Sequence, residues 1–235
     1  MRDVLIAFAA LALPGTALAQ AGQCRLPDII PRPQVEGPTA DEPKRVLPIG
    51  HYTLAVSWSP AYCARSKGGA KDDFQCNSGN RFGFTLHGLW PDGYGKDWPQ
   101  YCKAAPLLPR KVIRDHLCAT PSVQLIQHEW VKHGTCLPTT PTSFFALSRK
   151  LYGALRYPDM AALAARPTLS AREFATAFAA ANKGMSADMM KLNVNRDGTL
   201  GEVWVCLNKA LRYARCPAHQ GGANDGTRIR IVPQR

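Results

Sequence analysis

Eight cysteines constrain what this 235-residue chain can fold into more than any other feature of its sequence. Their number is even, and no two of them form a C-x-x-C pair. In an oxidising compartment this usage favours a disulfide framework over a metal-binding knuckle, so four bridges are expected. Eight cysteines allow roughly a hundred pairings, and the sequence alone does not choose among them.

Position along the chain suggests some of these pairs. Cys206 and Cys216 flank two alternating runs and could close a hairpin. Cys63 and Cys76 bracket a polar loop and could close it. The other disulfide candidates are Cys24, Cys102, Cys118 and Cys136.

The first 21 residues have the pattern of an export signal, which agrees with the cysteine usage. Arg2 gives a basic start, residues 4–13 are apolar, and Ala-Leu-Ala at 17–19 is a cleavage site of the A-x-A type. A membrane anchor would need about 20 apolar residues. The Pro-Gly pair at 14–15 interrupts the apolar run too early for that. We therefore expect a cleaved signal peptide, no membrane anchor after processing, and a periplasmic or extracellular protein.

The rest of the chain has the composition of one globular domain. The chain is 46% hydrophobic and 20% charged, which is enough apolar material for one sizeable core. Residues 22–48 contain six prolines and no apolar period, so they are expected to form an extended arm without chemistry of its own. Residues 49–235 would then be the catalytic domain. The net charge of +12 favours a polyanionic partner.

Two early stretches alternate in the manner of strands. Residues 51–58 place Tyr52, Leu54, Val56 and Trp58 on one face. In residues 81–87, Phe82, Phe84 and Leu86 point to one face, whereas Thr85 and His87 point to the other. His87 is therefore expected to end a strand on the side away from the core, before a sharp turn at residues 88–93.

The middle of the chain is helical and its end returns to strands. Residues 142–157 carry apolar residues at helical spacing. Residues 170–173 form a capping box, with Leu169 and Phe174 as its hydrophobic staple and Gly184 as the stop. Strand character returns at residues 202–207, 211–216 and 227–232. Strands early, helices in the middle and strands late indicate an α+β domain.

Residues 128–136 read His-Glu-Trp-Val-Lys-His-Gly-Thr-Cys and are expected to form the end of a helix. Thr120-Pro121 would supply its cap and first-turn proline, and Gly134 a left-handed stop. A bridge from Cys136, for which Cys102 is a candidate partner, would fix this helix end.

Four ionisable side chains fall within these residues. On an α-helix Glu129, Lys132 and His133 share one face, so an acid, an ammonium and an imidazole converge. A zinc site is one alternative, but His128 and His133 are at i and i+5, about 140° apart on an α-helix. A metal would therefore need His87 and another ligand, and none is expected.

Nucleophilic hydrolysis by the protein is a second alternative with little support. No G-x-S-x-G elbow is present, and every cysteine has a plausible disulfide role. RNA carries its own nucleophile, the ribose 2′-hydroxyl. Its cleavage needs a base, an acid and cations around the phosphorus, and two imidazoles, a Lys and a Glu meet that need. His51, His116 and His219 are interpreted as structural residues.

Aromatic residues gather in the loop after the first histidine segment. Trp90 lies next to His87, and Tyr94, Trp98 and Tyr101 follow before Cys102. Rings in an otherwise polar loop form a platform on which a flat base can stack. The alternative for each ring is loop packing, which is the more ordinary role of a single aromatic residue.

The two histidine segments resemble the two active-site segments of the ribonuclease T2 family, in the family's order. They are residues 84–91 (FTLHGLWP) and residues 128–136 (HEWVKHGTC). Residues 54–60 (LAVSWSP) and the late pair Cys206 and Cys216 also resemble that family. The likeness spans roughly residues 50–217, and with its export signal the chain is most similar to the bacterial, ribonuclease I-like branch.

The resemblance implies a single disulfide-bonded α+β domain with a central antiparallel sheet flanked by helices. It implies endonucleolytic cleavage of single-stranded RNA through a 2′,3′-cyclic phosphate, without metal or cofactor. By the same resemblance His133 would be the base, His87 the acid, Glu129 and Lys132 the groups that stabilise the pentacoordinate phosphorus, and His128 a phosphate ligand. The acid and base labels could be reversed.

The resemblance also implies base-binding residues. Trp90, Asp92 and Trp98 would form the first base site. Family members often carry an aromatic residue before the second segment, where this chain has Leu-Ile-Gln at 125–127. A missing ring removes about 1–3 kcal/mol of stacking per base, so broad base specificity is expected.

Two other classes of protein remain as hypotheses. One is a secreted RNA-binding or toxin-like protein that keeps the fold without activity, although no catalytic position is replaced here. The other is a zinc hydrolase, which a chelator would inactivate. For the ribonuclease we expect indifference to chelator, no cleavage of DNA, and a monomer, because the sequence gives no sign of oligomerisation.

Overall fold

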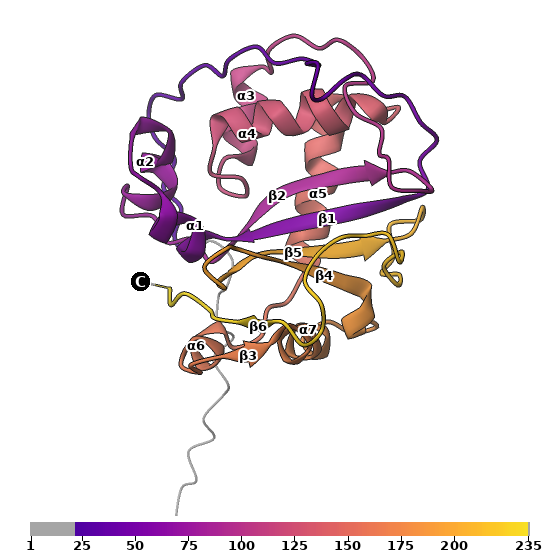
Figure 1. Cartoon of the computed structure of the whole chain (residues 1–235). Helices are drawn as coiled ribbons and strands as arrows, with labels where there is room; N and C mark the ends of the chain where they lie inside the picture. The colour runs from indigo at the N-terminus through magenta and orange to yellow at the C-terminus, as the bar shows by residue number, and fades with distance from the viewer. Residues whose placement is uncertain (1–21, 235) are drawn as a thin grey trace, which may run out of the picture.

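The computed structural model describes residues 22–234, so the expected export signal lies outside the described residues. A four-stranded antiparallel sheet in the order β2-β1-β5-β4 forms its centre, and a second sheet of two strands pairs β3 with β6 (Figure 1). The α+β prediction with a central antiparallel sheet is confirmed. The strands are β1 His51–Trp58, β2 Phe84–Asp92, β3 Leu169–Ser170, β4 Met190–Val194, β5 Leu200–Leu207 and β6 Arg228–Ile229.

Helices border the sheet. Figure 1 shows α3 and α4 beyond its β2 side and α6 and α7 beyond its β4 side, next to the small sheet. The α-helices are α1 Ser59–Arg65, α2 Ala70–Cys76, α3 Arg110–His116, α4 Val123–His128, α5 Pro141–Ala154, α6 Met160–Ala164 and α7 Ala171–Ala180. Shorter helical turns are the π-turn η1 Glu129–His133 and the 3₁₀ turns η2 Gly134–Cys136 and η3 Ala187–Met189.

The core is built on rings from strands and helices. Phe84 of β2 is fully buried and stacks on Tyr157 with ring centroids 4.7 Å apart. Trp58 of β1 and Phe178 of α7 pack against the Phe84 ring, with centroid distances of 4.9 Å and 6.2 Å. These contacts bring β1, β2 and α7 into one apolar cluster. The alternation in β1 and β2 predicted that these two strands face the core.

Strand β2 runs further than predicted. It continues to Asp92, because its pairing with β1 extends to the partners His51 and Asp92. His87 therefore lies within the strand and does not end it. The pairing register shifts at this point. Ala55 pairs with Gly88 and Val56 pairs with Leu86, so His87 is an extra residue without a partner in β1. A bulge of this kind redirects a side chain.

The second histidine segment is not the end of a regular α-helix. α4 is capped by Ser122, whose hydroxyl accepts from the Leu125 amide, and not by Thr120, whose hydroxyl donates to the Leu86 carbonyl. After His128 the chain enters the π-turn. Gly134 has φ −61°, so the predicted left-handed stop is wrong.

The reason for glycine at position 134 is space. A Cβ there would lie 2.4 Å from the ring of Trp130 and 3.2 Å from that of Phe144. Gly134 therefore lets the helical segment pack against these rings, and its amide closes the π-turn on the carbonyls of Glu129 and Trp130.

The later predictions hold in part. α5 matches the predicted helix over residues 142–157 but ends three residues earlier, and the capping box of Ser170 and Glu173 is present. α7 ends at Ala180, before Gly184. Residues 211–216 form only one isolated bridge, because Leu211 turns the chain with φ +58°. β4 was not predicted.

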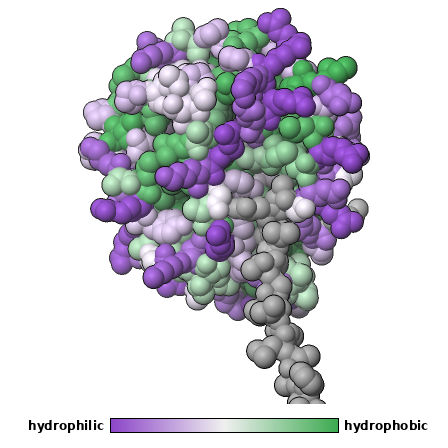
Figure 2. Space-filling view, turned by 180° about the vertical axis from the view of Figure 1, so that it is seen from behind, coloured by the Kyte–Doolittle hydropathy of each residue, from purple (hydrophilic) through white to green (hydrophobic). Residues whose placement is uncertain are grey.

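All eight cysteines form disulfides, as predicted. The bridges Cys206–Cys216 and Cys63–Cys76 join the suggested partners, and Cys102–Cys136 ties the end of the second histidine segment. The fourth bridge, Cys24–Cys118, holds the start of the arm. Among the described residues no helix has the length and apolar character that a membrane crossing requires. Figure 2 shows hydrophilic and apolar residues interspersed on the rear face.

Candidate active site

One pocket of about 390 Å³ lies between β2, β5 and the segment formed by α4 and η1. All eight residues predicted to act in catalysis or substrate binding line it, together with Trp204 of β5. They are His87, Trp90, Asp92, Trp98, His128, Glu129, Lys132 and His133. The structure thus brings two segments about 40 residues apart to a single site.

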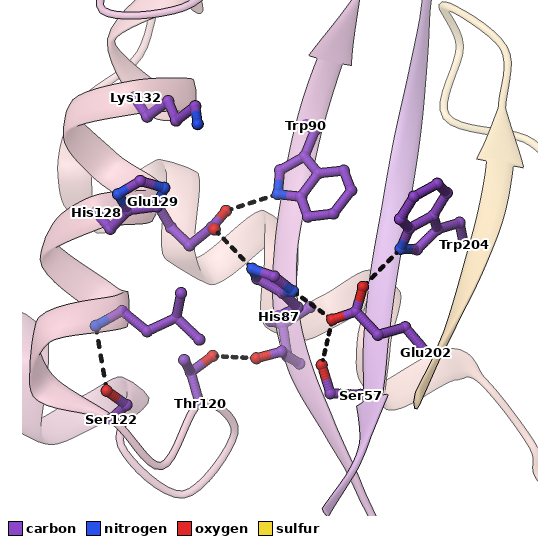
Figure 3. A network of polar contacts seen from close by, with 12 residues as sticks. Ser57, His87, Trp90, Thr120, Ser122, His128, Glu129, Lys132, Glu202 and Trp204 are labelled. Carbon is purple, nitrogen blue, oxygen red and sulfur yellow. Dashed lines mark hydrogen bonds and ion pairs between the residues drawn. The ribbon is translucent and has the colours of Figure 1, made fainter. Parts of the chain in front are cut away.

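His87 is held between two carboxylates (Figure 3). Its Nδ1 lies 2.6 Å from Glu202 Oε1, and its Nε2 lies 3.5 Å from Glu129 Oε1. Burial alone would lower the pKa of His87, but the hydrogen bond to Glu202 and the charges of both carboxylates raise it. The imidazolium form of His87 is therefore more favoured than that of an ordinary histidine.

Glu202 is a site residue that sequence reasoning missed. It lies on β5, where Ser57 and Trp204 donate hydrogen bonds to its two oxygens at 2.7 Å and 2.8 Å. Burial raises its pKa, but the bonds from His87, Ser57 and Trp204 outweigh burial and lower it to about 2. Glu202 is thus a fixed anion behind the imidazole. Its place on the half-buried side of an alternating strand was the only available signal.

Glu129 is buried between the two segments. The Trp90 indole donates to its Oε2 at 3.0 Å, and among the described residues Oε1 has no hydrogen-bond partner. Burial raises the pKa of Glu129 to about 7, against the lowering effect of His87 and Trp90. Gly88 makes this position accessible, because a Cβ there would lie 1.7 Å from Glu129 Oε2.

His133 has the opposite electrostatic environment to His87. It is buried and stacks on Trp90, with ring centroids 5.6 Å apart and an angle of 29°. Burial lowers the pKa of His133 well below its usual value, and the charges of His128 and Lys132 lower it further. The neutral imidazole is therefore favoured at neutral pH. Within residues 22–234 its Nδ1 has no hydrogen-bond partner.

The π-turn decides how the second segment presents its histidines. The rings of His128 and His133 lie 6.3 Å apart, so the prediction that they diverge by about 140° is wrong. That angle assumed an α-helix, whereas hydrogen bonds in a π-turn join residues five apart and bring i and i+5 to one side. Ligand atoms of His128, Glu129 and His133 lie within 4.8 Å of one another, so this trio has the spacing to hold a cation.

Lys132 and His128 of the segment are already paired with the arm. Lys132 Nζ donates to Glu42 Oε1 at 2.6 Å, and His128 Nδ1 lies 2.8 Å from Glu36 Oε2. Lys132 and Glu129 both line the pocket, but the ion pair of Lys132 is with Glu42 of the arm. The arm was assigned no chemistry, and nothing in its sequence marked these two acids.

Asp92 and Trp98, the two other predicted base-site residues beside Trp90, also line the pocket. Asp92 Oδ2 accepts a hydrogen bond from Thr53 at 2.6 Å and lies 3.4 Å from His51 Nε2. Burial raises the pKa of Asp92, although Thr53 and His51 oppose that effect. Trp98 is 41% exposed, and the Arg45 guanidinium lies 5.1 Å from the centre of its ring.

Comparison with known sequences agrees with this geometry. The sequence model of the "Ribonuclease T2 family" matches residues 49–216. A "Probable ribonuclease" of Haemophilus influenzae is 36% identical over 123 residues, which are 48% of this chain and 45% of that protein. A "Ribonuclease" of Aeromonas hydrophila is 38% identical over 101 residues, 43% of this chain and 44% of that protein. The chain thus spans under half the length of these curated relatives.

Solved structures show the same fold at low sequence identity. Trichomaglin, described as an S-like ribonuclease, superposes with a TM-score of 0.61 at 19% identity, over 80% of this chain and 100% of that one. RNase NT, solved in complex with 5′-AMP, gives 0.57 at 22% identity, over 79% and 99%. Because the matching sequence model covers more than half of the chain, including both histidine segments, the protein belongs to the ribonuclease T2 family.

Proposed function

We propose that this protein is an endoribonuclease that cleaves single-stranded RNA by transfer of the phosphodiester to the ribose 2′-hydroxyl. One observation carries the proposal. His87 and His133 line the same pocket, and their surroundings displace their pKa values in opposite directions. Environments that separate the pKa values of two titratable groups favour one as acid and the other as base.

In the first step His133 acts as the base. Its neutral imidazole takes the proton of the 2′-hydroxyl, and the freed oxygen attacks the adjacent phosphorus. The bond from phosphorus to the 5′-oxygen breaks, and His87 gives its proton to that oxygen. The products are a 2′,3′-cyclic phosphate and a 5′-hydroxyl. Each proton transfer of this kind is worth roughly 10²- to 10⁴-fold in rate.

In the second step the roles exchange. His87, now neutral, takes a proton from water, which attacks the cyclic phosphate, and His133 returns its proton to the 2′-oxygen. Glu202 acts as a positioning residue throughout: its bond to Nδ1 leaves Nε2 of His87 directed toward the pocket and Glu129. This assignment of acid and base agrees with that implied by the family resemblance.

Glu129 and Trp90 would act on the charge at phosphorus. With a pKa of about 7, roughly half of the Glu129 side chains carry a proton at neutral pH. A protonated Glu129 donates to a phosphoryl oxygen from Oε1, the atom that makes no hydrogen bond in the described structure. A protonated Glu129 carries no negative charge and so does not repel the phosphate. Lys132 and His128 would bind phosphate oxygens from the other side.

The substrate would lie with its base toward Trp90, Asp92 and Trp98. RNase NT, which shares the fold, was solved with 5′-AMP, and an exposed indole beside a carboxylate is suited to stack on and hydrogen-bond a base. Because Leu-Ile-Gln at 125–127 offers no second ring, we propose broad base specificity. Similar cleavage rates at all dinucleotide steps would support it.

We also propose that the protein is exported and acts in the periplasm or outside the cell as a monomer, with residues 49–235 as its catalytic domain. Four disulfides support export, because such bridges persist in oxidising compartments. The proposed signal peptide at residues 1–21 is tested by sequencing the N-terminus of the exported protein.

The decisive experiment offers the protein matched RNA, DNA and 2′-O-methyl RNA in the presence of a chelator. We expect that only RNA is cut, leaving cyclic phosphate or 3′-phosphate ends. Cleavage of the other two would exclude the 2′-hydroxyl as nucleophile. Loss of activity in chelator would favour the zinc hydrolase, for which His128, Glu129 and His133 have suitable spacing. Binding of RNA without cleavage would favour the inactive RNA-binding protein.

A further inference from the structure

The arm, residues 22–48, is fastened at both ends and contacts two residues of the candidate site, His128 and Lys132, between them. The Cys24–Cys118 disulfide holds its start. Near its end Arg45 and Gln100 exchange two backbone hydrogen bonds of 2.9 Å and 2.8 Å. Between these points it forms no helix or strand, and Figure 1 shows it running outside α3 and α4. Such a segment can lift without unfolding the sheet.

Two carboxylates fix the middle of the arm to the active segment. Glu36 contacts His128 at 2.8 Å and also accepts from Gln124, and the Gln34 amide donates to Gln124 Oε1 at 2.7 Å. Glu42 accepts from Lys132 at 2.6 Å and from the Tyr101 hydroxyl at 3.0 Å. Both acids therefore contact side chains that line the pocket, His128 and Lys132.

These carboxylates occupy the places that phosphate oxygens need. An anionic oxygen at hydrogen-bond distance from an ammonium or an imidazole is what an RNA phosphate would supply there. Lys132 is only 12% exposed and its ammonium already donates to Glu42, so a phosphate bound at the same ammonium would lie beside the Glu42 carboxylate and be repelled by it. RNA and the arm therefore compete for Lys132 and His128.

We propose that Glu36 and Glu42 determine the protein's affinity for RNA, by occupying His128 and Lys132 until the RNA backbone displaces the arm. The inference rests on the proposed function and names residues outside its catalytic machinery. Displacement precedes formation of the complex, so the two acids raise KM and leave kcat unchanged. They also disfavour weakly bound anionic ligands, because the binding free energy of such a ligand does not compensate for the loss of two ion pairs.

The size of the effect follows from the exposure of the pairs. Glu42 is 45% exposed, and Glu36 and His128 are 23% and 28% exposed, so solvent weakens both contacts. Two such pairs together change an equilibrium by about 3- to 10-fold. The arm is therefore held firmly enough to occupy Lys132 and His128 and weakly enough for a polyanion to displace it.

The test compares two double variants that each remove two negative charges from the arm. E36Q/E42Q keeps side-chain shape but loses both ion pairs. D28N/D41N is the matched control, because Asp28 and Asp41 are exposed and have no ion pair within residues 22–234. The measurement is the Kd for a fluorescent 2′-O-methyl oligoribonucleotide, which the protein is not expected to cut, followed by KM and kcat on RNA.

We expect E36Q/E42Q to bind the oligonucleotide about 3- to 10-fold more tightly than D28N/D41N, with KM lowered and kcat retained. Equal or weaker binding by E36Q/E42Q would overturn the proposal, and a lowered Tm beside it would mean that the acids only stabilise the fold. The single variants E36Q and E42Q repeat the comparison if the double variant does not fold. Tighter binding by a protein that does not cleave RNA would refute the proposed function alone. If E36Q/E42Q cleaves RNA but binds the oligonucleotide no more tightly than D28N/D41N, this inference alone is refuted.

Discussion

Replacing Glu202 by glutamine removes the anion behind His87 and keeps the shape of the side chain. Glu202 Oε1 lies 2.6 Å from His87 Nδ1, and this bond opposes the effect of burial and raises the pKa of His87. The acid form of His87 exists below that pKa, so cleavage declines as pH rises through it. In E202Q the pKa of His87 falls, and the alkaline limb of the pH–rate profile therefore moves to lower pH.

The magnitude follows from the kind of bond that is lost. A hydrogen bond to a charged group contributes about 1.5–3 kcal/mol, and each 1.4 kcal/mol or so is a factor of ten in rate. Above the shifted limb kcat/KM should therefore fall by about 10- to 100-fold. At acidic pH, where His87 stays protonated in both proteins, the loss should be much smaller.

The assay is kcat/KM for a short RNA across pH, with the His87 ring followed by NMR in the same samples. Ser57→Ala is the matched control, because it removes another hydrogen bond of Glu202 and leaves the contact with His87 in place. We expect the control to keep the alkaline limb. An unmoved limb in E202Q, or an equal shift in both variants, would refute the role of Glu202 as a positioning residue.

Three further substitutions test other parts of the account. Gly88→Ala brings a Cβ within 1.7 Å of Glu129 Oε2, so kcat should fall by about 100-fold or more. Gly95→Ala is the control and should keep activity, because Gly95 has open space around it. Phe178→Ala removes a fully buried ring and should lower the free energy of unfolding in urea by about 3–5 kcal/mol. Replacing both cysteines of the Cys102–Cys136 bridge by alanine should lower it by about 2–4 kcal/mol; an unchanged urea midpoint would contradict either stability prediction.

The sequence predicted part of the sheet and most of the pocket, because both depend on local patterns. Alternation of apolar residues placed β1, the first half of β2 and most of β5, and the two histidine segments contain six of the residues that line the pocket. The disulfide partners Cys63–Cys76 and Cys206–Cys216 followed from short spacing.

What the sequence did not predict depends on contacts between distant residues. The π-turn at Glu129–His133 requires Gly134 to pack on Trp130, which no helical pattern reveals. The partner of His87 is Glu202, 115 residues away. The partners of His128 and Lys132 lie in the arm. An acid on a strand or in a loop looks like an ordinary solvated residue until the fold places an imidazole beside it.

The central claim, that His87 protonates the leaving oxygen while His133 activates the 2′-hydroxyl, is tested most directly with a changed leaving group. An RNA dinucleotide with sulfur in place of the bridging 5′-oxygen leaves as a thiolate and needs no acid. We expect H87A and H133A each to lose about 100-fold or more on ordinary RNA. On the sulfur substrate H87A should recover nearly wild-type cleavage, whereas H133A should stay inactive. Recovery by H133A instead, or full turnover of ordinary RNA by either variant, would contradict the account.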